Sequence, residues 1–294
     1  MLRDIREQAI GSDIVPTLEE QRAAMDGFRE FATLPTGVDV VEVDAGGVRA
    51  EWITPHGADT DRVLMYVHGG GYVIGSMGTH TRLVGHLAKS AGCRALNLDY
   101  RLAPEHPHPA AVEDGTAAYR WLLDQGSDPA NIVIGGDSAG GGLTVAIALK
   151  LRDEGLPQPA GLVPISPWID LEGTGASMES KAEVDLLVDR DGLKLMTDMF
   201  LAGQDANDPL AAPLHADLTG LAPMYIQVGG DETLLDDSTR LAANAATAGL
   251  DVRLDCFPEM QHVFQMAVGN VPEADDAVAR AASWMSDHMG RRAS

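Results

Sequence analysis

The chain has 294 residues, enough for one large α/β domain or two smaller ones. Its 44 acidic residues against 21 Lys and Arg give a formal net charge of −23, which argues against nucleic acid and anionic membrane surfaces as partners. The glycine clusters match neither the GxxxxGK nor the GxGxxG spacing, so we expect no nucleotide cofactor, and no cofactor of any other kind is indicated.

The N-terminal segment, up to about Asp44, carries a predicted helix start. Thr17 to Glu20 reads as a capping box, and Met25, Phe28 and Phe31 then recur at helical spacing. No sustained apolar run of secretory or membrane-spanning length is visible, so the cytoplasm is the expected location.

An apolar segment, Val63 to Val67, ends in the tetrapeptide His68-Gly69-Gly70-Gly71. Glycines without a β-carbon let the backbone come close to a ligand. Their N–H groups can then point at an oxygen that becomes negative during acyl transfer. We therefore predict an oxyanion-binding turn after this strand; a flexible turn without function is the alternative.

A second glycine motif, Gly136-Asp137-Ser138-Ala139-Gly140, follows the apolar stretch Ile132 to Ile134 and precedes a helical pattern. A serine between two such glycines fits the nucleophile elbow, in which a sharp strand-to-helix turn exposes the hydroxyl. Alone, the pattern could be a glycine-rich loop with a surface serine. Its position downstream of the first motif favours Ser138 as a nucleophile.

Helical patterns alternate with short β-branched runs through most of the chain, which predicts one doubly wound, mostly parallel α/β core domain. Two segments fall outside this alternation: residues 1–44 and an insertion at 170–214, which includes a predicted helix at 191–201. The core is expected at 45–169 and 215–294. Five core helices are predicted at 79–91, 111–125, 139–153, 236–248 and 272–289.

The last third of the chain supplies an acid and a base in the order that this scaffold requires. Strand Met224 to Val228 is followed by Asp231, and strand Val252 to Phe257 by His262. Both loops should open at the sheet edge that carries Ser138. His262 is preferred among nine histidines as the base. Asp231 is preferred as the acid because it lies at the strand tip; three neighbouring carboxylates compete for that role: Glu232, Asp236 and Asp237.

Metal and disulfide chemistry are not indicated. Asp189 to Gly192 resembles the centre of a calcium loop but fails at its first and twelfth positions, so we interpret it as a helix start. His106 and His108 lack a convincing third ligand. The two cysteines, Cys93 and Cys256, fit reduced core thiols.

Four segments of the chain together resemble the bacterial hormone-sensitive-lipase-like (family IV) esterases, in the subgroup whose serine motif reads GDSAG: HGGGYVIGS, YRLAPEHPHPAAVED, GDSAGGG and PEMQHVF. The resemblance implies an α/β-hydrolase fold with an eight-stranded sheet, and a helical cap formed by residues 1–44 and 170–214. It also implies a catalytic triad and oxyanion amides at six positions: Ser138, Asp231 and His262, with Gly70, Gly71 and Ala139. One departure concerns the acid, where many relatives read Asp-Pro-Leu and this chain continues Asp231-Glu232-Thr233-Leu234.

The expected function is therefore a serine carboxylesterase that acts on small ester substrates of short to medium acyl length. A lactone hydrolase with the same triad is the runner-up, a non-catalytic small-ligand receptor on the same scaffold is a further alternative, and a peptidase is less favoured. Homodimers are frequent in the family, so a homodimer is possible. Five side chains are candidates to line the substrate pocket, although each could equally be core: Tyr72, Trp168, Phe200, Val263 and Phe264.

Overall fold

The computed structural model describes residues 16–290 and contains an eight-stranded sheet in the order β1-β2-β4-β3-β5-β6-β7-β8. β2 is antiparallel to both of its neighbours, β1 and β4. The remaining pairs in the sheet, from β4-β3 to β7-β8, are all parallel. The strands are β1 (Val38–Asp44), β2 (Arg49–Pro55), β3 (Asp59–Val67), β4 (Cys93–Leu98), β5 (Ile132–Asp137), β6 (Gly161–Ile165), β7 (Met224–Gly229) and β8 (Val252–Phe257). The predicted mostly parallel sheet is confirmed.

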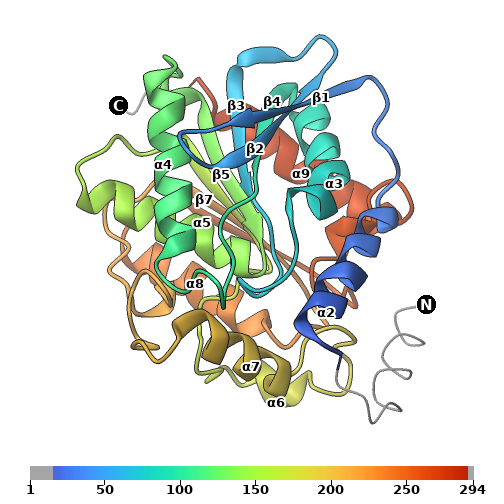
Figure 1. Cartoon of the computed structure of the whole chain (residues 1–294), viewed down its shortest axis with the longest axis vertical. Helices are drawn as coiled ribbons and strands as arrows, with labels where there is room; N and C mark the ends of the chain where they lie inside the picture. The colour runs from blue at the N-terminus through green and yellow to red at the C-terminus, as the bar shows by residue number, and fades with distance from the viewer. Residues whose placement is uncertain (1–15, 291–294) are drawn as a thin grey trace.

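Helices cover both faces of the sheet (Figure 1). On one face lie α3 (Met77–Ala91) and α9 (Pro272–His288); on the other lie α4 (Ala110–Asp124), α5 (Ala139–Asp153) and α8 (Leu235–Thr247). β3 shows why both layers are needed. Its residues Val63, Met65 and Val67 belong to the core beneath α4 and α5, and the alternate residues Leu64 and Tyr66 belong to the core beneath α3 and α9.

The five predicted core helices are confirmed to within two residues at each end. One predicted boundary is wrong. Residues 38–44 form β1, which pairs with β2 along its whole length, so they belong to the sheet and not to the N-terminal segment outside the core. The part of that segment at 1–15 lies outside the described residues. Of the two cysteines, Cys93 is a buried free thiol as expected, whereas Cys256 on the edge strand β8 is exposed.

Two segments lie beyond the carboxyl ends of the parallel strands. The first holds α2 (Leu18–Met25), with the predicted capping box at Thr17, followed by a 3₁₀ helix at Asp26–Phe31. The second connects β6 to β7 and holds α6 (Ser177–Ser180) and α7 (Arg190–Leu201). Figure 1 shows α2, α6 and α7 gathered at one end of the molecule. Within residues 16–290, no helix is both long and apolar enough to cross a membrane.

Candidate active site

Ser138 lies in the sharp turn between β5 and α5. Its backbone has φ 55° and ψ −122°, a conformation that a side chain seldom adopts and that marks a constrained turn. The turn is possible because its flanking residues are glycines. A β-carbon on Gly136 would collide with the carbonyl oxygens of Val67 and Gly140, and one on Gly140 with the carbonyl oxygen of Val67. The predicted elbow geometry is therefore present, and Ser138 lines a cavity.

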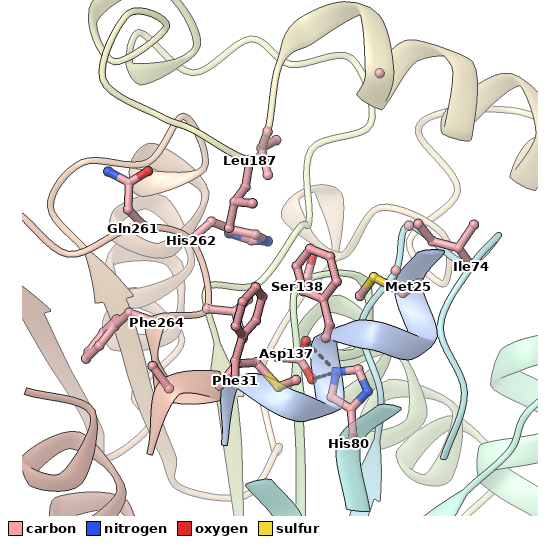
Figure 2. A pocket seen from close by; sticks show the side chains of 18 of the residues that line it. Met25, Phe31, Ile74, His80, Asp137, Ser138, Leu187, Gln261, His262 and Phe264 are labelled. Carbon is pink, nitrogen blue, oxygen red and sulfur yellow. Dashed lines mark hydrogen bonds and ion pairs between the residues drawn. The ribbon is translucent and has the colours of Figure 1, made fainter. Parts of the chain in front are cut away.

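His262 lines the same cavity, from the loop that follows β8 (Figure 2). Its Nδ1 lies 2.7 Å from Oε2 of Glu232, a carboxylate that is completely buried. The second oxygen of Glu232 accepts a hydrogen bond from Oγ of Ser166 at 2.8 Å and another from the amide of Gly229. The carboxylate is thus held on both oxygens, and it fixes the imidazole from the side that faces away from the cavity.

The prediction of Asp231 as the partner of His262 is wrong. Asp231 is 28% exposed and forms an ion pair with Nζ of Lys181 at 3.1 Å. Both residues lie in the loop after β7, and of the two carboxylates only that of Glu232 reaches the imidazole. A signal for Glu232 was present in the sequence. In the relatives' Asp-Pro-Leu the acid precedes leucine by two positions, as Glu232 precedes Leu234.

The electrostatics of His262 suit a general base. Burial alone would lower its pKa, but the hydrogen bond and negative charge of Glu232 outweigh burial, so the pKa lies above the ordinary histidine value of 6.5. With Nδ1 directed at the carboxylate, the proton of the neutral ring belongs on Nδ1. Nε2 is then the basic nitrogen.

The turn after β3 carries amides without partners. Gly70 and Gly71 have φ values of 114° and 61°, which side chains disfavour, and both line the cavity. The carbonyl of Gly70 accepts hydrogen bonds from Val73 and Ile74, which closes the turn. Within residues 16–290, the amides of Gly70, Gly71 and Ala139 have no protein acceptor. Ala139 is also the first residue of α5, where the helix dipole favours negative charge.

A buried network behind Ser138 was not anticipated from the sequence. Asp137 Oδ1 accepts hydrogen bonds from the hydroxyl of Tyr66 (2.8 Å) and the amide of Gly69 (3.2 Å), and lies 3.2 Å from Nε2 of His80 (Figure 2). Burial would raise the pKa of Asp137, but interaction with His80 holds it below its ordinary value. Asp137, the residue before Ser138, therefore ties the elbow to the glycine turn.

His68 has a structural role at the start of the glycine turn. Burial and the nearby His80 lower its pKa to about 4, so the ring is neutral, and its Nδ1 donates to the carbonyl oxygen of Gly69 at 2.7 Å. The ring also stacks on Tyr100, with 4.3 Å between centroids. These contacts stiffen the first residues of the turn.

The cavity has a volume of about 620 Å³. It lies between the core and two outer segments, the one that holds α2 and the one that connects β6 to β7. Its walls are mostly apolar, with side chains from the 3₁₀ helix after α2, from α7 and from the loop after β8: Phe28, Phe31, Met196, Met260, Val263 and Phe264. Methionine walls repack readily around ligands of different shape. Ser138 and His262 are among the few polar groups that converge on this space.

Two of the five predicted lining residues, Val263 and Phe264, do line this cavity. The other three do not line it and are core residues, the alternative that the sequence left open. Tyr72 and Phe200 are buried against each other, with stacked rings 3.9 Å apart, and therefore support the wall from behind. Trp168 lies 6.2 Å from Tyr72 and borders a separate cavity of 400 Å³ beside α7. The sequence predicts that an aromatic ring is buried, but it does not predict whether that ring lines a cavity or packs behind its wall.

The α/β-hydrolase fold family matches residues 64–266, which span the glycine turn, the elbow and the histidine loop. The chain belongs to this family. An acetyl-hydrolase of Streptomyces hygroscopicus is 45% identical over 276 residues, which cover 93% of this chain and 91% of the relative.

Solved structures extend the likeness to the whole architecture. An esterase of the bacterial hormone-sensitive lipase family has a TM-score of 0.94 and 45% identity, covering 98% of this chain and 97% of its own. EstE5 in a crystal soaked with p-nitrophenyl butyrate has a TM-score of 0.93 and 42% identity, covering 99% and 97%. The chain is a hormone-sensitive-lipase-like hydrolase of carboxylic esters.

Proposed function

We propose that the chain is a serine carboxylesterase with the triad Ser138, His262 and Glu232, acting on short- to medium-chain esters through an acyl-enzyme. The observation that carries this proposal is the 2.7 Å contact from Glu232 to the ring of His262 in a cavity that Ser138 also lines. A nucleophile, a base and an orienting acid are then supplied from three loops at the same edge of one sheet, after β5, β8 and β7.

In the first step, Nε2 of His262 removes the proton from the Ser138 hydroxyl as its oxygen attacks the ester carbonyl. Glu232 keeps the useful tautomer in place and stabilises the imidazolium that forms. The imidazolium then protonates the departing alcohol. In the second step, water gives a proton to His262 as its oxygen attacks the acyl-enzyme. The imidazolium then protonates Oγ of Ser138 as the bond to the acyl group breaks, which releases the acid and restores the serine and the neutral histidine.

The amides of Gly70, Gly71 and Ala139 are the proposed oxyanion donors. They are fixed in a glycine turn and at a helix start, so they need no rearrangement when the carbonyl oxygen becomes negative. One such donor is typically worth about 3 kcal/mol in the transition state. The free amides thus support acyl-transfer chemistry rather than simple ligand capture.

The proposed substrates are esters whose acyl groups have two to about eight carbons. A space of 620 Å³ with methionine and phenylalanine walls can hold such a chain together with an alcohol group. The acetyl-hydrolase relative and the p-nitrophenyl butyrate soak of EstE5 point in the same direction. We also propose that the segment ending at Phe31 and the β6–β7 segment act as a cap, since both contribute to the cavity wall.

The decisive experiment measures p-nitrophenyl ester turnover by the wild-type chain and by Ser138→Ala. We expect the variant to lose at least about 10⁴-fold in kcat. A panel of acyl lengths and lactones would separate the esterase from the runner-up lactone hydrolase. A receptor on this scaffold would release no burst of p-nitrophenol, and near wild-type turnover by the variant would refute Ser138 as the nucleophile.

A further inference from the structure

Helix α2 forms part of the cavity wall although none of its residues is buried. Gln21, Ala24 and Met25 line the cavity, and the aromatic rings of Phe28 and Phe31 continue the same wall. A helix of eight residues that buries none of them has little stability of its own. It must therefore be held in place by particular contacts with the core.

Leu18 packs against the core, and Arg22 provides the hydrogen bonds. Its Nε donates to the carbonyl oxygen of Val73 at 2.9 Å, and Nη2 donates to that of Ala103 at 3.0 Å. Nη1 and Nη2 also bind both oxygens of Glu105, at 2.7 and 2.8 Å. Within residues 16–290, Arg22 makes every hydrogen bond that joins a side chain of α2 to the core.

The partners of Arg22 belong to the machinery beneath the helix. Val73 donates its own amide to Gly70, whose N–H is a proposed oxyanion donor. Ala103 donates its amide to the carbonyl oxygen of Tyr72 in the same turn. One guanidinium group thus connects the substrate wall, the glycine turn and the loop that carries Glu105.

We propose that the Arg22–Glu105 pair is a latch that fixes α2 as a wall of the substrate cavity, and that Arg22 is a positioning residue for esters long enough to reach that wall. This inference rests on the proposed esterase function. The guanidinium is suited to the task because its planar fork serves two backbone carbonyls and a bidentate carboxylate together, which a lysine cannot do. We expect an acetyl group, the shortest acyl chain tested, to depend least on the wall.

The test compares Arg22→Ala, Arg22→Lys and Glu105→Gln with the wild-type chain on p-nitrophenyl acetate and p-nitrophenyl octanoate. Arg120→Ala is the matched control, since Arg120 forms an ion pair with Glu154 between α4 and α5, away from the cavity. We expect Arg22→Ala to raise KM for the octanoate about tenfold, the change expected for loss of a bidentate charge-assisted pair, and to raise KM for the acetate much less. Arg22→Lys should raise KM for the octanoate less than Arg22→Ala does. The control Arg120→Ala should show none of these changes.

Amide hydrogen exchange over residues 18–31 provides a readout that does not depend on activity. Exchange there should accelerate in Arg22→Ala and Glu105→Gln and stay unchanged in Arg120→Ala. An equal loss on both esters, or unchanged exchange in Arg22→Ala, would overturn the latch. If the wild-type chain hydrolyses neither ester while the exchange of α2 still responds, the esterase proposal fails and the anchoring role of Arg22 stands.

Discussion

Glu232 and His262 are joined by a 2.7 Å hydrogen bond, whereas Asp231, the residue before Glu232, is far more exposed and pairs with Lys181 instead. The pair yields a direct test. Glu232→Gln should lower kcat by about 10³- to 10⁴-fold, because an amide nitrogen facing Nδ1 would favour the wrong tautomer.

Asp231→Asn is the matched control for that change. It removes a carboxylate one position away but breaks only a partly exposed ion pair with Lys181, so kcat should stay within about threefold of wild type. Steady-state kinetics on one p-nitrophenyl ester would measure both variants. A large loss in Asp231→Asn with a small one in Glu232→Gln would return the acid to Asp231.

The pH profile of kcat/KM should report the raised pKa of His262. The base acts only when neutral, so activity falls tenfold per unit below its pKa, and the midpoint of this acid limb should lie above the ordinary value of 6.5. In Glu232→Gln the residual activity should show a limb at lower pH, because burial then acts without the compensating charge. A limb that does not move between the two proteins would contradict the assignment.

Stability should respond to Asp237, which is buried at the start of α8. Burial raises its pKa to about 7, while Oδ2 accepts hydrogen bonds from the amides of Ile169 and Asp170. A raised folded-state pKa means that the proton stabilises the fold. This stability is complete below the unfolded value of 3.8 and is lost as pH rises through 7.

Asp237→Asn keeps an oxygen acceptor for both amides but never ionises. Relative to wild type, the variant should gain stability as pH rises from about 4 to 7, by at most about 1.4 kcal/mol per pH unit. Urea unfolding at several pH values would measure the difference. If the difference in free energy of unfolding between the two proteins did not change with pH, Asp237 would not titrate in this range.

Charge at the cavity should select among esters. The lining within residues 16–290 includes the carboxylates of Asp137, Asp189 and Glu259 but no lysine or arginine, and the chain carries a net charge of −23. At low salt, we expect kcat/KM for the anionic ester mono-p-nitrophenyl succinate to be about tenfold below that for the neutral ester p-nitrophenyl butyrate. This difference in kcat/KM should become smaller as added salt screens the charge of the carboxylates.

Two conservative variants test the source of that selectivity. Asp189 caps α7 by accepting from Gly192, and asparagine caps a helix equally well, so Asp189→Asn removes charge without removing the cap. Glu259→Gln is its counterpart in the loop before His262. The double variant should narrow the gap between anionic and neutral esters; an unchanged ratio at every salt concentration would discount the carboxylates.

The sequence by itself predicted the parts of this site that depend only on residues close together in the chain. Strand-to-helix turns need glycine where a β-carbon would strike the backbone, so the elbow around Ser138 and the turn at Gly70 were readable from the sequence. The same holds for the helix start at Asp189, now observed as the cap of α7. The histidine loop was readable from chain order, because the parallel strands end at one sheet edge.

Choices that depend on the direction of a side chain in three dimensions were decided only by the tertiary structure. Selecting Glu232 over Asp231 required the position of His262, 30 residues away, and recognising Tyr72 and Phe200 as buried supports required the packing of α7. The contact between Arg22 and Glu105 spans 83 residues. No periodicity or spacing encodes such a contact, because its energy arises only once the folded backbone has brought the two groups together.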